Sequence, residues 1–200
     1  MPKVQIPRER ILRAAMDLVI REGNQALTIG RLAKELGCST QPISWTFGSM
    51  EAFREEFAEY VLREFNSREV PHGTGAVQMF AAVGLRYLRA AFDEPNLIHF
   101  IRANSQRMVA HGGIGTVFDP QVHEKLVKTL SQSLGITAAD AAHFIQTSVI
   151  YTQGLVSLIV DGTIHIDYAD AVHRLETIGI QCLVLAGVPE ETAAQQVRLI

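Results

Sequence analysis

The chain has 200 residues, a length that suits one large domain or two small ones. With 48% hydrophobic and 20% charged residues it has the composition of a globular protein, which excludes the disordered and low-complexity classes. Its two cysteines cannot build a disulfide framework, and they form no Cys-x-x-Cys pair for zinc. The first residues show no apolar signal segment, so we expect a protein of the reducing cytoplasm.

The charge is distributed unevenly along the chain. The net charge is −3, yet residues 1–47 contain seven Lys or Arg against four Asp or Glu, so the rest of the chain is acidic. A basic end on an acidic body indicates an anionic partner for the N-terminal end alone.

The first 66 residues have the pattern of four helices. Apolar residues recur at helical spacing in each segment, and Gly23 and Gly37 follow the first and second segments as helix-ending residues. The residues that open the four helices, as N-caps or in a first turn, are expected to be Pro7, Thr28, Ser39 and Ser49.

Five more helical segments follow in the rest of the chain. No run of period-two alternation interrupts them, so we predict an all-α fold with about nine helices. The later segments run from Thr74 to about Phe92, from Pro95 to near His111, from Asp119 onward, from Thr137 to Asp161, and from Asp167 to before Gly187.

The second and third helices have the layout of a helix-turn-helix. Only about two residues, Gly37 and Cys38, separate the second helix from the Ser39 cap, and a joint this short lets two helices cross steeply. In this motif the later helix enters the major groove of DNA. The spacing directs Ile43 and Phe47 toward the core; the outward residues are Thr40, Gln41, Ser44 and Trp45. An ordinary helical hairpin in a bundle is the alternative interpretation.

Residues 141–160 contain no Asp, Glu, Lys or Arg and are long enough to cross a bilayer. Several polar side chains in this stretch would need partners in lipid. We therefore interpret it as a helix buried in protein or at a subunit interface, and we expect no membrane partner.

The stretches ILRAAMDLVIREG and LTIGRLAKELGCSTQPISWTFGSMEAF resemble the N-terminal pattern of the tetracycline-repressor (TetR) family of transcriptional regulators. The order of features matches without gaps over residues 8–53. The resemblance implies a DNA-binding domain over residues 1–48 and a ligand-binding and dimerisation domain over residues 49–200, with the helix over residues 49–66 connecting them.

The resemblance also implies which residues meet DNA. Ser44, Thr46 and Met50 depart from the family pattern, which commonly has Tyr, then His or Tyr, then Lys at these positions. Loss of the lysine removes one phosphate contact, and Arg8, Arg10, Lys3 and Arg31 are candidates to compensate in part. The candidate DNA-binding residues are Thr28, Ser39, Thr40, Gln41, Ser44, Trp45, Thr46 and Arg8.

For the rest of the chain, the resemblance implies a homodimer built through the last two predicted helices. It also implies a palindromic double-stranded DNA operator and a pocket for a small organic ligand of unknown identity. Such pockets are mostly apolar with a few polar groups. The candidate ligand-binding residues are Phe100, Asn104, Arg107, Met108, His143, Gln146, Thr147 and Tyr151.

No motif in the chain indicates an enzyme or a metal site, because no two histidines are four residues apart and no nucleophile motif occurs. We expect no catalytic residue, metal or cofactor. The competing hypothesis is a helical ligand-binding or interaction protein that keeps the helix-turn-helix head but binds DNA weakly or not at all.

Overall fold

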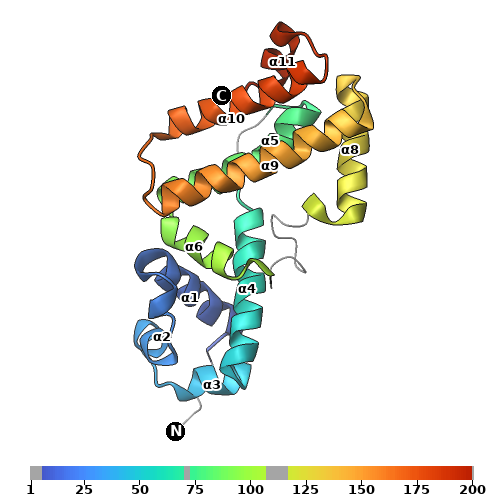
Figure 1. Ribbon diagram of the computed structural model, residues 1–200. Coiled ribbons are helices and arrows are strands. Elements are labelled where there is room, and N and C mark those ends of the chain that lie inside the picture. The colour runs from blue at the N-terminus through green and yellow to red at the C-terminus, as the bar shows by residue number, and fades with distance from the viewer. Residues whose placement is uncertain (1–5, 70–72, 107–116, 200) are drawn as a thin grey trace. The chain divides into compact units, whose positions relative to one another are not determined.

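The computed structural model describes residues 6–69, 73–106 and 117–199 (Figure 1). Over these ranges the chain forms ten α-helices, one 3-10 helix and no strand, which confirms the predicted all-α fold. The elements are α1 (Arg8–Glu22), η1 (Asn24–Ala26), α2 (Ile29–Glu35), α3 (Gln41–Phe47), α4 (Met50–Asn66), α5 (Ala76–Asp93), α6 (Pro95–Ala103), α8 (Pro120–Leu134), α9 (Ala138–Val160), α10 (Tyr168–Leu185) and α11 (Glu190–Val197).

Three features differ from the sequence-based expectation. Helix α3 has Thr40 at its N-cap position with no side-chain capping bond, so Ser39 lies one residue too early to cap it. Helix α6 ends at Ala103, and the Asn104 side chain donates to the carbonyl of Phe100 at 2.9 Å in its last turn; the expected end near His111 lies outside the described residues. Helix α11 comes after the last helix that the sequence patterns predict.

The chain divides into two compact units. The first unit is Met1–Arg68 with Glu94–Gly115, and the second unit is Glu69–Asp93 with Thr116–Ile200. The expected domain boundary at residue 48 does not coincide with this division, since α4 and α6 both belong to the first unit.

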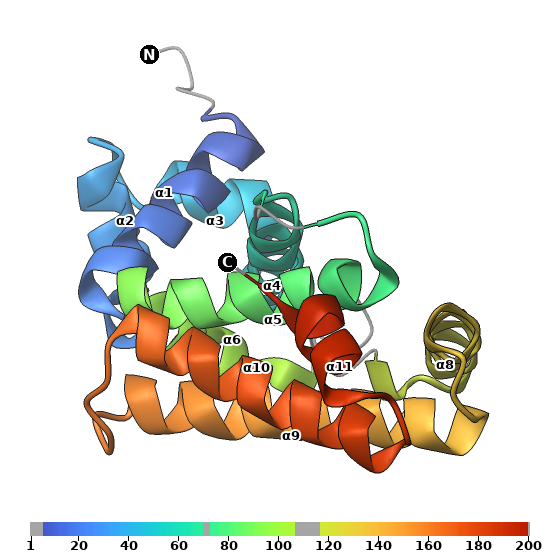
Figure 2. The same ribbon diagram turned by 90° about the horizontal axis from the view of Figure 1, so that it is seen from above.

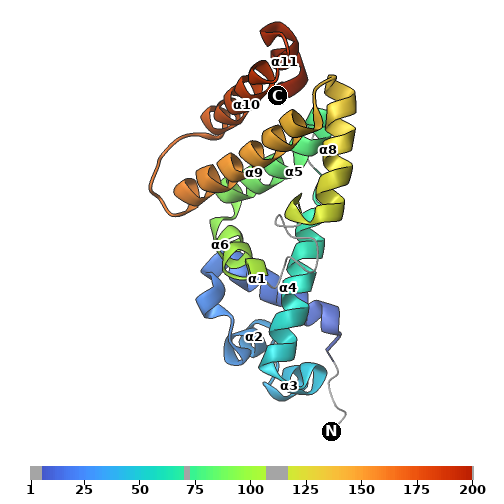
Figure 3. The ribbon, with the colours of Figure 1, turned by 45° about the vertical axis from the view of Figure 1, so that its right-hand side comes forward.

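In the first unit, α4 is the element along which the others are arranged. Figure 3 shows α6, α1 and α3 at successive levels of α4, and α4 contacts all three of these helices. Helix α1 buries its apolar face and packs mainly against α6, with further contacts to α2 and α4. The three N-terminal helices therefore share one core with α4 and α6.

A row of aromatic rings runs through this core. Phe47 at the end of α3 meets Phe53 edge to face, with ring centroids 5.0 Å apart. Phe53 stacks on Phe57 at 5.7 Å, and Phe57 meets Phe100 of α6 at 5.0 Å. Contacts of this kind add specific geometry to the burial of large apolar side chains. The row, which we call the aromatic row, fixes the end of α3 to α4 and α6.

In the second unit, α9 is the central helix and contacts α5, α8 and α10. Figure 2 shows α9 and α10 side by side, with α11 folded back against α10. Gly179 of α10 is buried, and a β-carbon added at this position would lie only 2.9 Å from a methyl carbon of Val197 in α11. The unpredicted α11 thus depends on the absence of a side chain at Gly179.

Helix α9 is long and apolar enough to cross a membrane by length and composition alone, although one such helix is weak evidence. Its buried face includes Phe144, Ile145 and Leu155, and three neighbouring helices of the second unit cover it. These contacts agree with the expectation of a helix buried in protein or at a subunit interface; 33% of its most apolar stretch is buried within the described residues.

Cys182 of α10 lies in the core of the second unit. Burial raises the pKa of its thiol above the ordinary value of 9.0, and a hydrogen bond with Thr147 of α9 opposes this only in part. A thiol whose pKa is raised by folding favours the folded state while it stays protonated.

Phe57 is fully buried in the middle of the aromatic row, so its replacement removes contacts on both sides. We predict that Phe57→Ala lowers the free energy of unfolding of the first unit by about 3–5 kcal/mol. Chemical denaturation followed by circular dichroism measures this loss. Phe118→Ala, at a phenylalanine that is 50% exposed, is the matched control and is expected to change stability by less than about 0.5 kcal/mol.

We predict that the free energy of unfolding of the second unit falls as the pH rises above about 9, by at most about 1.4 kcal/mol per pH unit for Cys182. The reason is that the thiol ionises first in the unfolded chain. Thermal unfolding between pH 7 and 10 measures the decline, which Cys182→Ala should reduce and Cys38→Ala should leave in place. Equal declines in the wild type and in Cys182→Ala would contradict this effect of burial.

Candidate nucleic-acid interface

The joint between α2 and α3 is built by local hydrogen bonds. The Thr28 hydroxyl oxygen accepts from the backbone N–H of Arg31 at 3.3 Å and caps α2. At the other end Gly37 has φ of 65°, a left-handed conformation that favours glycine, and the Cys38 N–H returns to the carbonyl of Ala33 at 3.0 Å. This compact turn positions α3 immediately after α2.

Helix α3 has one buried and one exposed face. Ile43 and Phe47 are buried, in the direction that their spacing predicts. Thr40, Gln41 and Ser44 are exposed, and so is Trp45, the chain's single tryptophan, which is 59% exposed. The exposed face offers an amide, hydroxyls and an indole, and α3 carries no charged residue.

The hydroxyl groups on α3 also bond to their own helix. The Thr46 hydroxyl donates to the carbonyl of Pro42 at 2.8 Å, and the Ser44 hydroxyl donates to the carbonyl of Thr40 at 3.3 Å. Each hydroxyl oxygen keeps acceptor capacity. Thr46 is half-buried, so it is less accessible to a partner than Ser44. Ser39 and Thr28 are both exposed on the α2–α3 side of this unit.

The Arg8 side chain is 53% exposed, yet its polar contacts are with other residues of the first unit. One of its guanidinium nitrogens donates to the carbonyl oxygen of Thr46 at 2.6 Å, and the other pairs with the carboxylate of Glu56. The guanidinium carbon lies 5.0 Å from the centre of the Phe47 ring. Sequence reasoning places Arg8 among the DNA contacts and does not identify Glu56, because no local pattern links residues 48 positions apart.

Other basic side chains join α1 to α2. Arg31 pairs with Glu22, and Arg21 pairs with Glu35 at 3.0 Å. These pairs neutralise part of the positive charge of residues 1–47. Arg10 and Lys34 are exposed and form no ion pair with another described residue.

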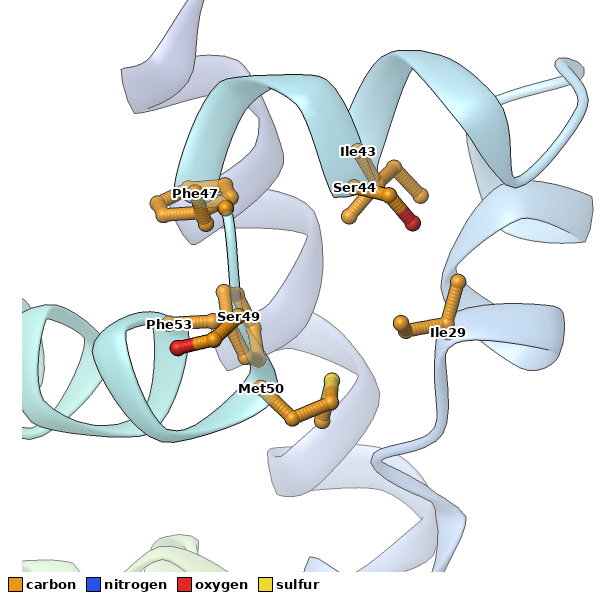
Figure 4. Close-up of a pocket in the computed structure, with 8 residues that line it drawn as sticks. Ile29, Ile43, Ser44, Phe47, Ser49, Met50 and Phe53 are labelled. Carbon is orange, nitrogen blue, oxygen red and sulfur yellow. The ribbon is translucent and has the colours of Figure 1, made fainter.

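A small hollow lies beside α3, where α2, α3 and α4 meet (Figure 4). Ile29, Ile43, Phe47 and Met50 are among its lining residues, and its volume of about 50 Å³ suits one or two water molecules. Met50, at the start of α4, is half-buried and lines this hollow, so the residue at the family's lysine position is apolar and directed toward the hollow.

The candidate ligand-binding residues have different surroundings. Phe100 is buried against Phe57 in the first unit, and the Asn104 side chain closes α6 in that unit. On α9 of the second unit, His143 and Gln146 are exposed and Tyr151 is half-buried.

Thr147 of α9, also a candidate ligand-binding residue, forms a hydrogen bond with the thiol of Cys182 in α10. Arg107 and Met108 lie outside the described residues. The contacts found are those of the fold itself, so a ligand-binding role for these side chains stays a prediction.

Residues 11–57 match the model of a family described as "Bacterial regulatory proteins, tetR family". In addition, 81 residues of the chain are 31% identical to the tetracycline repressor protein class A from transposon 1721 of Escherichia coli. That alignment takes in 40% of this chain and 38% of the length of the repressor. The matched residues include α2, α3 and most of α1, whose geometry is described above. Residues 11–57 therefore form a domain of the kind found at the N-terminus of the tetR family of bacterial regulatory proteins.

Proposed function

We propose that the protein is a DNA-binding transcriptional regulator of the cytoplasm that acts as a repressor. The observation that carries this proposal is the exposed face of α3, with Gln41, Ser44 and Trp45 outward while Ile43 and Phe47 anchor the helix in the core. A helix with one anchored face and one polar, aromatic face suits insertion into the major groove.

The side chains of α3 favour base reading over charge neutralisation. A glutamine amide matches the N6 and N7 edge of adenine, and an apolar surface such as the Trp45 indole packs on the methyl group of thymine. Because α3 has no charged residue, its contacts release no counterions. Discrimination between sequences is therefore assigned to α3, and phosphate contacts to residues outside it.

We further propose that the protein is a homodimer that binds a palindromic operator. Ile150 and Leu158 of α9 are 65% and 42% exposed, and Leu185 of α10 is 80% exposed. Ile150, Gly154 and Leu158 recur every four residues on one side of α9, and open space surrounds Gly154. An exposed apolar surface with a small residue in it suits close packing against a second copy of the chain.

A small organic ligand is proposed to release the protein from DNA. The ligand would favour a conformation in which the distance between the two copies of α3 no longer matches the spacing of the operator half-sites. In that case bound DNA must lower the affinity for the ligand by the same factor by which bound ligand lowers the affinity for DNA. Ligand affinities measured with and without operator test this reciprocity.

The second candidate is a helical ligand-binding or interaction protein with little affinity for DNA. It is supported by the ion pairs that engage Arg8, Arg21 and Arg31 and by the inward position of Met50. Selection of bound fragments from genomic DNA at low salt separates the two. Enrichment of a discrete sequence supports the regulator, and no retained fragment supports the alternative.

We predict that Gln41→Ala and Trp45→Ala each lower affinity for the selected operator by about 5- to 100-fold, the range for one good base contact. Affinity for unrelated DNA and the salt dependence of binding should stay unchanged, because no charge is removed. Anisotropy of a labelled duplex measures both. The control is Gln25→Ala at an exposed glutamine of η1, and equal losses on all sequences would refute base reading.

We predict that Ile150→Glu converts the dimer to a monomer, because it places a charge in the proposed apolar interface. Size-exclusion chromatography with light scattering gives the mass. Val122→Glu, on α8 at a side chain that is 45% exposed, is the matched control and should leave the dimer intact. A wild-type chain that is monomeric at micromolar concentration would contradict the dimer proposal.

A further inference from the structure

Arg8 joins three helices of the first unit through one guanidinium group. It extends from the first turn of α1, donates to the Thr46 carbonyl of α3 at 2.6 Å and pairs with Glu56 of α4. The guanidinium group also lies over the ring of Phe47. An exposed ion pair alone contributes little to stability. Here the same group also binds a backbone carbonyl and covers an anchoring aromatic side chain.

The Thr46 carbonyl that accepts from Arg8 lies in the last turn of α3, where carbonyls lack partners within the helix. A helix leaves its last four carbonyls without partners inside the helix, and α3 has only seven residues. The Gly48 N–H takes the carbonyl of Ser44 at 2.9 Å, and Arg8 takes that of Thr46. A cation at a helix C-terminus also interacts favourably with the helix dipole, and α3 has no basic residue of its own there.

This contact is next to the face of α3 proposed to read DNA. Thr46 follows Trp45 directly, and Phe47, under the guanidinium, is the first ring of the aromatic row. A two-turn helix is too short to hold its conformation alone. The direction of Trp45 therefore depends on how firmly the last turn of α3 is held on α1 and α4.

We propose that Arg8 is a positioning residue for the recognition helix, which fixes the last turn of α3 to α1 and α4 and makes no contact with DNA phosphate. Glu56 offsets part of the guanidinium charge and the Thr46 carbonyl accepts from a second guanidinium nitrogen, so the polar partners of Arg8 lie within the first unit. The expected effect of Arg8 on operator affinity rests on the proposed DNA-binding function. Its effect on the last turn of α3 is testable without DNA.

The first experiment uses the full-length protein without DNA. Arg8→Met should raise the rate of amide hydrogen exchange in the last turn of α3, from Ser44 to Gly48, by about fivefold. This factor corresponds to the loss of one charged hydrogen bond, reduced because the group is exposed to solvent. Arg10→Met, on the same helix with no ion pair to a described residue, should leave this exchange unchanged. Unchanged exchange in Arg8→Met would overturn the proposal.

The second experiment measures operator affinity against salt concentration. A positioning role predicts that Arg8→Met lowers affinity about fivefold at every salt concentration, with the same slope. A phosphate contact would instead lower the slope by about 0.9 per protomer. A reduced slope therefore overturns the proposal, even where the affinity loss is similar.

Replacing Glu56 changes operator affinity in opposite directions under the two roles of Arg8. If Arg8 contacts phosphate, Glu56→Met frees the guanidinium and raises affinity; if Arg8 positions α3, the same change loosens α3 and lowers affinity. The double variant Arg8→Met with Glu56→Met should bind no more weakly than Arg8→Met alone, since the two side chains act as one unit. Should Arg8→Met fail to fold, Arg8→Lys serves, because lysine lacks the fork that reaches both partners. Failure of wild-type binding would refute the proposed function and leave the exchange result to decide the role of Arg8.

Discussion

The position of α3 is the constraint on which the proposed function depends. Seven residues make two helical turns, which do not persist in water without tertiary contacts. Ile43 and Phe47 supply those contacts on one face, and this leaves Gln41, Ser44 and Trp45 on the other. The exposed face keeps one orientation only because the buried face fits one place in the core.

That place is determined well beyond the three N-terminal helices. The aromatic row continues from Phe47 through Phe53 and Phe57 to Phe100, so α6 contributes to holding the end of α3. Arg8 adds a polar contact at the same end from α1. Apolar packing sets the depth of α3 in the unit, and the directional bonds of Arg8 set the orientation of its last turn.

Local patterns in the sequence predict most of this arrangement. Caps at Thr28, Ser49, Asp119, Thr137 and Asp167 are formed by side chains that accept backbone N–H groups, and they mark helix starts within one or two residues. The inward direction of Ile43 and Phe47 follows from helical spacing alone. These features depend on residues that are neighbours along the chain.

What the patterns do not predict depends on residues far apart in sequence. The Arg8–Glu56 pair and the Phe57–Phe100 contact join separate helices, and no periodicity encodes them. Gly179 has the small size expected at a subunit contact, yet the space beside it is taken by Val197 of α11. A small residue shows that something approaches closely, and only the tertiary structure shows what does.

The order of segments along the chain has a consequence for how the first unit holds together. The unit is made of two segments, separated by Glu69–Asp93, which contains α5. Arg68 and Glu94, the residues on either side of this excursion, pair with each other at 2.6 Å. This ion pair joins the point where the chain leaves the first unit to the point where it rejoins that unit. Helix α6 follows, and its Phe100 packs against Phe57. A fragment ending at residue 48 or 66 would lack Phe100 and leave one side of Phe57 uncovered. The core beneath α3 is therefore completed by residues that follow α5 in the chain.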